Sequence, residues 1–264
     1  MVETKSIKTL GKLIDVLDCF STTDRSLSVS DIARRSSLPR STAHRAIMAL
    51  KEVGFLEQDR AREEYRLGLR LFQLGTTVLN SMDLQRVARP FVEALSTLAR
   101  ASVHLCVFDG ERMVFVERSL GDPSGPSNDT ITMEISPCFC TSVGKAALAF
   151  QPDAIIEKVI ASGLIAYTPS TMTRPDQLRA ELGAIRARGY ALDREEHRIN
   201  IRCVGAPISN SAGRVFAAVS ASGPAHRMTE EMQHMLAPYV VGHADAISRR
   251  LGSVAGWPQH AGPN

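Results

Sequence analysis

The stretch "LPRSTAHRAIMALKEVGFLEQ", residues 38–58, decides how the first part of the chain folds. Pro39 has a fixed φ and no amide hydrogen, so it suits the first position of a helix. At about 100° per residue, the apolar side chains gather on one side of that helix, namely Ala43, Ala46, Ile47, Leu50 and Val53. Gly54 is a residue type that commonly ends helices. The sequence therefore predicts an amphipathic helix over 39–53.

The opposite side of this helix carries polar groups in its first two turns. Ser41, His44 and Arg45 offer hydroxyl, imidazole and guanidinium groups, which are suited to reach base edges in a DNA major groove. We expect Arg45 to bind a guanine. Arg40, Ser41 and Thr42 are placed to bind phosphate through side chains or the first amides of the helix. The pattern favours a recognition helix.

Two helices are expected before it. Apolar residues recur at helical spacing over 6–20, which predicts a first amphipathic helix. Ser28 followed by Asp31 resembles a capping box with the shorter acid and predicts a second helix that ends near Arg35. The order helix, short turn, helix is that of a helix-turn-helix unit.

A charged β-hairpin is expected after the recognition helix. Phe55 and Leu56 begin one strand, and residues 65–67 form its partner. We expect Arg62 and Arg66 in this wing to reach flanking phosphate or the minor groove. The alternative is a helical protein-interaction module with a solvated hairpin, because short helix-turn-helix matches carry false positives.

Composition limits the class of protein. The chain has 264 residues, 44% of them hydrophobic, which is enough for one large or two moderate domains. Residues 1–75 hold 13 Lys and Arg against 10 Asp and Glu, whereas residues 76–264 hold 18 of each. The net charge of +3 therefore lies in the first segment, which fits contact with a polyanion. The sequence has no apolar stretch long enough to predict a signal peptide or a membrane span. Its five cysteines indicate reduced thiols. We therefore expect a cytoplasmic protein with no membrane partner.

The second part of the chain begins with a helical stretch over 76–101. Its apolar surface is wider than one face needs, so we expect a linker helix that also forms a dimer, opened or kinked at Pro90. The alternative is a helix buried within its own monomer. Beyond residue 102, strands are expected at VHLCVFDG, RMVFVERS, TITMEIS, YALD, RCVGAPIS and VFAAVSAS, with helices over 142–150, 153–162, 175–188 and 229–251.

Several motifs resemble those of one family, the isocitrate lyase regulator (IclR) family of bacterial transcription factors. They are "LPRSTAHRAIMALKEVGFLEQ", "YRLGLRLFQLG", "TSVGKAALAF", "IRARGYALDREEHRINIRCVGAPI" and "FAAVSASGP", in the family's order and spacing. The resemblance implies an α+β fold: a winged helix-turn-helix over 1–75, a linker helix over 76–101 and a GAF/profilin-like effector domain over 102–252, whose curved antiparallel sheet is flanked by helices. We expect residues 253–264 to be a disordered tail.

The resemblance also implies partners. They are a double-stranded DNA operator, palindromic in sequence, and a small-molecule effector. A homodimer or a dimer of dimers would present two recognition helices to such an operator. Whether the protein represses or activates stays open.

The candidate effector site combines polar groups from several elements. Thr141 and Ser142 stand at a strand-to-helix turn whose amides favour an acid group, and Ser220 and Ser222 face the same side of one strand. By resemblance, the family's effector pocket is lined by Ser142, Val143, Asp193, Cys203, Ser220 and Ser222. The effector expected is a small organic acid, aromatic or sugar-derived. The alternative is that the serines and Cys203 are ordinary strand residues that satisfy backbone groups.

The segment Pro137–Cys140 departs from the family. Many relatives carry a histidine two residues after the proline, where this chain has Phe139, so no particular effector is carried over. Phe139 removes a hydrogen-bond donor and enlarges the apolar wall.

Two other classes of function stay open. An enzyme could use Cys138, Cys140 or Cys203 as nucleophile with His104, His197 or His226 as base. However, no local sequence motif places a third group that would orient the base. A metal or redox sensor could use Cys138 and Cys140, although a lone C-x-C lacks the second half of a zinc site. We expect no catalytic residue, no metal and no cofactor.

Overall fold

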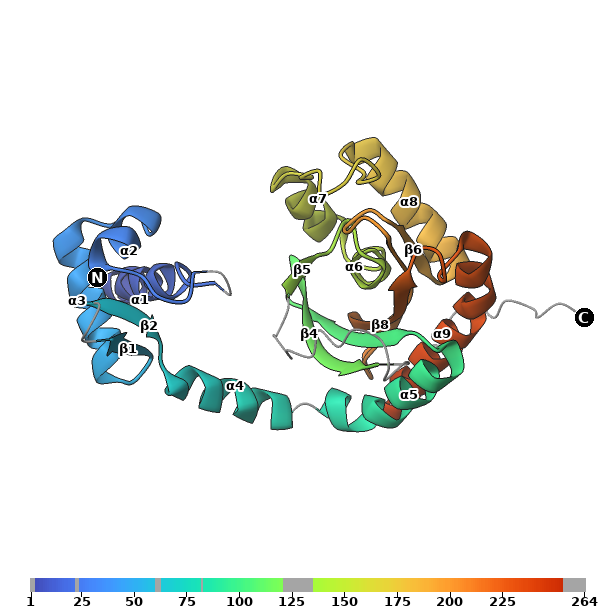
Figure 1. Cartoon of the computed structure of the whole chain (residues 1–264), viewed down its shortest axis with the longest axis horizontal. Coiled ribbons are helices and arrows are strands. Elements are labelled where there is room, and N and C mark those ends of the chain that lie inside the picture. The colour runs from blue at the N-terminus through green and yellow to red at the C-terminus, as the bar shows by residue number, and fades with distance from the viewer. Residues whose placement is uncertain (1–2, 22–23, 60–62, 82, 121–134, 254–264) are drawn as a thin grey trace, which may run out of the picture. The chain divides into compact units, whose positions relative to one another are not determined.

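A computed structural model describes residues 3–21, 24–59, 63–81, 83–120 and 135–253 (Figure 1). The chain divides into two compact units, Met1–Ser81 and Met82–Asn264. Within the described ranges, none of the helices has the length and apolar character that crossing a membrane would require.

The first unit is a winged helix-turn-helix. Its elements are α1 (Glu3–Leu17), α2 (Val29–Arg35), α3 (Arg40–Glu52), β1 (Leu56–Asp59), β2 (Glu64–Leu67) and α4 (Leu69–Ser81). The strands pair antiparallel, and Leu27 bridges to Tyr65 beside them. One small core holds the unit together and includes Val16, Ile32, Ile47, Leu50, Leu56 and Tyr65. The expected arrangement of helices and wing is confirmed.

Local differences appear at the two ends of α3. Pro39 is the residue before the helix rather than its first member, since its ψ of 139° is extended. Val53 was expected on the buried side, which is wrong: it follows the last helical residue and is 51% exposed. Gly54 has a φ of 77°, the left-handed value that favours glycine after a helix. At α2, Ser28 caps as expected by accepting a hydrogen bond from the amide of Asp31.

The second unit is built on a six-stranded antiparallel sheet. Its strands are β3 (Ser102–Phe108), β4 (Arg112–Ser119), β5 (Ile135–Pro137), β6 (Ala191–Arg194), β7 (Ile201–Ser209) and β8 (Val215–Pro224), in the order β5-β4-β3-β8-β7-β6. Its helices are α5 (Asp83–Ala99), α6 (Ser142–Leu148), α7 (Asp153–Ala161), α8 (Pro175–Arg188) and α9 (Glu230–Arg250). The expected strand over TITMEIS is described only from residue 135 onward.

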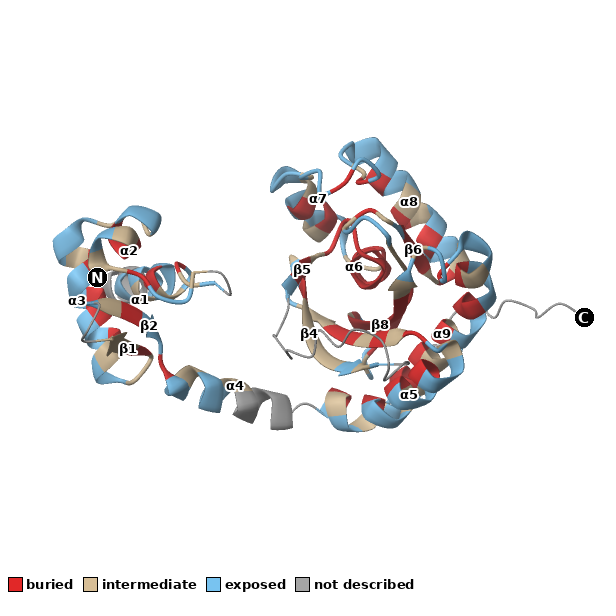
Figure 2. Ribbon diagram, in the orientation of Figure 1, coloured by how far each residue is buried: buried red, intermediate tan, exposed pale blue. Residues whose placement is uncertain are grey.

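Helices cover both faces of this sheet. Helices α5 and α9 pack on one face, where alternate strand residues such as Val103, Val204 and Val219 join the core (Figure 1). Helix α6 packs on the other face and is buried along its whole length (Figure 2). Successive side chains of a strand point to opposite faces of the sheet. Apolar residues occupy positions of both kinds, so both faces of the sheet are apolar. The polar residues described below interrupt the face toward α6.

Two expected boundaries can be compared with these units. The stretch 76–101 is divided: its first part lies in α4 of the first unit, and its second part is α5 of the second. Leu84, Val92 and Leu95 of α5 are buried in the core beneath the sheet.

Ser253 was expected in a loose tail, which is wrong, because it is buried and its hydroxyl lies 2.9 Å from that of Ser209. Residues 254–264 of that tail lie outside the described residues.

Candidate functional site

Helix α3 presents its polar side to the outside. Arg40, Ser41, His44 and Arg45 are exposed, Thr42 is half-buried, and Pro39 before them is exposed as well. The opposite side is fixed in the core, since four of its residues, Ala43, Ala46, Ile47 and Leu50, are buried. Within the described part of the chain, neither Arg40 nor Arg45 has an ion-pair partner. The expected recognition face is thus available to a polyanion.

The wing differs from a simple basic arm. Arg66 is exposed, but its guanidinium lies 3.0 Å from a carboxylate oxygen of Glu57 on the neighbouring strand. That carboxylate also accepts a hydrogen bond from the amide of Leu69, so it is tied to the start of α4. Phosphate binding by Arg66 would compete with this pair. Arg62 lies outside the described residues.

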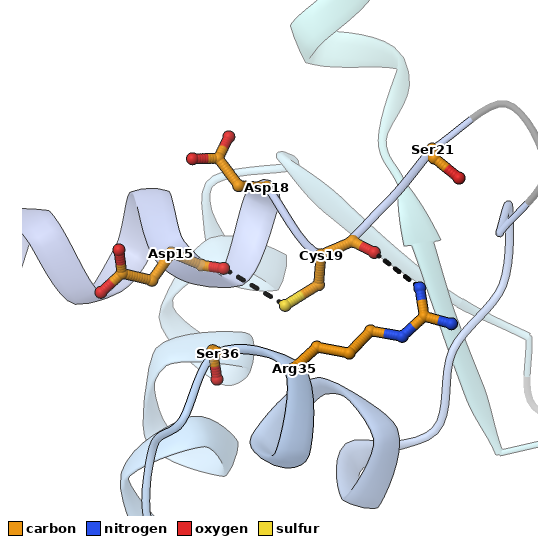
Figure 3. Close-up of a pocket in the computed structure, with 6 residues that line it drawn as sticks. All are labelled: Asp15, Asp18, Cys19, Ser21, Arg35 and Ser36. Carbon is orange, nitrogen blue, oxygen red and sulfur yellow. Dashed lines mark hydrogen bonds between the residues drawn. The ribbon is translucent and has the colours of Figure 1, made fainter. Parts of the chain in front are cut away.

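A polar hollow of about 440 Å³ lies where the end of α1 meets α2 (Figure 3). The Cys19 thiol donates to the carbonyl of Asp15, and the Arg35 guanidinium donates to the carbonyl of Cys19, at 3.2 Å each. Arg35 also binds Asp24 at 2.9 Å. These bonds join α1 to α2, so we assign the hollow a structural role.

In the second unit, three expected ligand residues form one row across the sheet. Asp193 on β6 is paired with Cys203 on β7, and Cys203 is paired with Ser222 on β8. The Ser222 hydroxyl donates to the Cys203 sulfur at 2.9 Å. All three side chains are on the α6 side of the sheet and are at least nine-tenths buried.

The start of α6 lies against this row. A Cβ on Gly205 of β7 would come within 3.1 Å of the Ser142 backbone and hydroxyl, so glycine permits the close approach. The side chain of Ser142 also forms a hydrogen bond with the Cys203 thiol. The fold thus brings Ser142 to Cys203.

Two neighbours of Ser142 have structural partners. The Thr141 hydroxyl caps α6 by accepting from the Gly144 amide and donates to the carbonyl of Pro137. The Val143 side chain belongs to the core between the sheet and α6. Only the Val143 backbone is therefore a candidate for ligand contact.

Ser220 extends the polar surface toward the middle of the sheet. It pairs with His104 on β3, which in turn pairs with Arg118 on β4. Burial, together with the charges of Arg118 and Arg198, lowers the pKa of His104 to about 3. The imidazole is thus neutral, and the charges of both guanidinium groups contribute to keeping it so.

An aromatic wall stands at the edge of the same region. The ring of Phe139 lies 6.2 Å from that of Tyr167, and Tyr167 lies 5.1 Å from the His197 ring, centroid to centroid. The amide of His197 also hydrogen-bonds Asp193. Tyr167 is 46% exposed, so the wall reaches solvent at this residue. Phe139 itself is buried and belongs to the core between the sheet and α6.

The cysteines are buried rather than reactive. The Cys138 thiol donates to the carbonyl of Glu111 at 2.8 Å, and burial raises its pKa to about 12. Burial also raises the pKa of Cys140 and of Cys203. The thiolate is the form that attacks substrates and binds metals, so these surroundings disfavour both uses. Within the described ranges, no group of three or more His, Cys, Asp or Glu is placed to hold a metal ion.

Two charged residues beside the row of Asp193, Cys203 and Ser222 were not predicted from the sequence. Lys145 on α6 is 1% exposed, and its Nζ lies 2.6 and 2.8 Å from the two carboxylate oxygens of Glu196. A lysine inside the apolar helix "TSVGKAALAF" was the available signal, because a buried lysine requires a partner. Glu196 gave no such signal, since "DREEH" has the composition of a solvated turn.

Comparison with known proteins agrees with both units. Residues 9–60 match the IclR helix-turn-helix domain, and residues 76–249 match the family described as bacterial transcriptional regulator IclR C-terminal. The chain is 30% identical over 253 residues to the HTH-type transcriptional repressor AllR of Salmonella paratyphi A, covering 94% of this chain and 91% of AllR.

Solved structures agree as well. The IclR of Thermotoga maritima is 32% identical, with a TM-score of 0.65 over 93% of this chain and 99% of that one. An IclR homolog from Microbacterium hydrocarbonoxydans, solved in complex with 4-hydroxybenzoate, is 28% identical with a TM-score of 0.72 over 92% and 99% of the two chains. Taken with the winged helix-turn-helix and the polar row on the sheet, these matches show that the chain belongs to the IclR family of bacterial transcriptional regulators, with an N-terminal DNA-binding domain and a C-terminal effector-binding domain.

Proposed function

We propose that the exposed side of α3 reads the operator sequence and that the wing binds beside it. Arg45 is the residue assigned to a base edge, because it is exposed in the second turn of the helix and has no ion pair within the described residues. Phosphate is assigned to Pro39–Thr42, with His44 beside them. The amides of Arg40 and Ser41 precede the first backbone hydrogen bond of α3, which the Thr42 amide donates to the carbonyl of Pro39. Arg62 and Arg66 are assigned to flanking DNA.

The ligand that we propose is a small organic acid with an apolar or aromatic body. The observation that carries this is the meeting of two surfaces in the second unit. The polar row of Asp193, Cys203 and Ser222 offers hydrogen bonds, and the wall of Phe139 and Tyr167 offers apolar contact. The guanidinium groups near His104 favour a negative charge. The 4-hydroxybenzoate bound by the Microbacterium homolog supports this class of ligand.

We further propose how the ligand acts. The protein works as a dimer or a dimer of dimers on a palindromic operator in the cytoplasm, and the ligand shifts it between two spacings of its recognition helices. Only a ligand with different affinities for the two states can do this. The second unit detects the acid without transforming it, since its thiols are buried and protonated.

The test separates ligand response from DNA binding. Operator DNA is labelled, and its binding to the full-length protein is followed by fluorescence anisotropy while 4-hydroxybenzoate and a panel of small acids are titrated. Asp193→Ala and Ser222→Ala should each abolish the response of the wild-type protein and leave operator affinity intact. The matched control is Asp153→Ala, an exposed position at the start of α7. Unchanged ligand titrations in both site variants would rule out this assignment.

A further inference from the structure

Asp193 is held in place by the turn that follows it. Its Oδ1 accepts a hydrogen bond of 2.8 Å from the amide of Glu196. The amide of His197 binds the same carboxyl group, and the backbone carbonyl of Asp193 accepts from Gln233 of α9 at 3.0 Å. The position of the carboxyl group therefore depends on where residues 194–197 lie.

That turn is fixed from outside by a buried ion pair and two hydroxyl groups. The Glu196 side chain binds Lys145 of α6 through both oxygens, and Glu181 of α8 lies 3.8 Å from the same ammonium group. The hydroxyls of Thr168 and Thr171 donate to the carbonyls of residues 195 and 196.

The backbone of the turn needs this support. Glu195 has a φ of 67°, a left-handed conformation that disfavours a residue with a side chain. Its carboxylate accepts from the amide of Asn200 at 2.9 Å and binds Arg202 at 3.1 Å, so the side chain stabilises the turn from the exposed side. Contacts on both sides thus hold one conformation, which places the Asp193 carboxyl against Cys203.

We propose that the buried pair of Lys145 and Glu196 is a positioning device of the ligand site, which acts through Asp193 and makes the binding of an acid depend on pH. This inference rests on the proposed function, namely that the site takes an organic acid. The pair itself is shielded from a ligand, because both side chains are buried and bound to each other.

The burial of Asp193 and the charges around it determine whether its pKa is raised or lowered. Its charged neighbours are Glu196 in the same turn and Lys145 on α6, and the thiols of Cys140 and Cys203 complete the titratable surroundings. Burial is the main cause that raises the pKa of Asp193 to about 7, the charge of Glu196 raises it further, and Lys145 opposes with a smaller effect.

A protonated carboxyl suits an anionic ligand. The neutral acid donates a hydrogen bond to the ligand's carboxylate, whereas the ionised form would repel it. Above the pKa of Asp193, the dissociation constant of such a ligand should rise about tenfold for each pH unit, since binding then requires uptake of one proton. Below that pKa, the dissociation constant should be independent of this group.

The experiment has one arm that needs no ligand. The C=O stretch of protonated Asp193 is followed by infrared spectroscopy as a function of pH, each protein being subtracted from the same protein with Asp193→Asn. We expect a midpoint near pH 7 in the wild type, a lower one in Glu196→Gln, and an intermediate one in the double variant Lys145→Gln with Glu196→Gln. The double variant also covers the case in which an unpaired Lys145 prevents folding. The control Asp153→Asn removes an equal charge at an exposed position of the same unit, outside the turn, and should leave the midpoint close to that of the wild type.

The second arm measures the dissociation constant of 4-hydroxybenzoate from well below to well above the pKa of Asp193 by calorimetry. In Glu196→Gln the rise in dissociation constant should begin at a lower pH than in the wild type. Equal infrared midpoints in wild type and Glu196→Gln, or an Asp193 already ionised at about pH 5, would overturn the proposal. Absence of 4-hydroxybenzoate binding would count against the proposed ligand class, while the infrared arm would still decide the role of the pair.

Discussion

The burial of Asp193 has a measurable consequence for stability. A rise in its pKa from the ordinary value of 3.8 to about 7 makes ionisation in the folded state unfavourable by roughly 4 kcal/mol, at about 1.4 kcal/mol per tenfold change. Between these pH values the folded protein binds more protons than the unfolded chain. Because the folded-state pKa is raised, the contribution of Asp193 to the unfolding free energy is largest at low pH and decreases as pH rises from about 4 to about 7.

Asp193→Asn removes this dependence while keeping the oxygen that accepts from the Glu196 amide. We expect the difference in unfolding free energy, wild type minus variant, to fall by about 2–3 kcal/mol between about pH 5 and pH 7, and to be constant above about pH 8. Urea unfolding of the full-length protein, followed by circular dichroism at each pH, measures it. The exposed Asp153→Asn serves as the control. A wild-type-minus-variant difference that is the same at both ends of this range would refute the reasoning.

Three further predictions concern the first unit. Arg45→Ala should lose about 1–3 kcal/mol of specific operator binding with little change on random duplex, and equal losses on both would reassign Arg45 to phosphate. Ser28→Ala removes the acceptor for the Asp31 amide and should lower the unfolding free energy by about 0.5–2 kcal/mol in thermal denaturation; no loss would show that water caps α2 as well. Ile47→Ala, at a fully buried position, should cost about 2–5 kcal/mol, whereas the neighbouring Met48→Ala, which is 42% exposed, should cost far less.

The first unit could be predicted from its sequence because its signals are local. The spacing of apolar residues in α3, the serine that caps α2 and the glycine after α3 each depend on neighbours within a few positions. The miss at Val53 has the same origin. The helical period continues through residue 53, but the helix ends one residue earlier, so the side chain turns outward.

The ligand site could be predicted only in part, because its contacts span the sequence. Alternation along β8 places Ser220 and Ser222 on one side, and this needs no tertiary information. The pairing of Lys145 with Glu196 joins residues 51 positions apart and depends on how α6 packs against the turn after β6. No local pattern could show that the charged turn is buried there.

The division of residues 76–101 has a similar cause. A wide apolar stripe is compatible with a linker or with a buried helix. The structure places α5 in the core of the second unit, while α4 belongs to the first. Sequence alone could not locate the boundary at residues 81 and 82, because helical periodicity is strong on both sides of it.

The central claim is that the exposed side of α3 selects a DNA sequence. Selection of genomic fragments by the purified full-length protein, carried out in parallel with Arg45→Ala and followed by sequencing, tests this most directly. We expect the wild type to enrich fragments that share two inverted half-sites and Arg45→Ala to lose this enrichment. Fragments recovered by the wild type in proportion to their abundance, with no shared sequence, would contradict the claim.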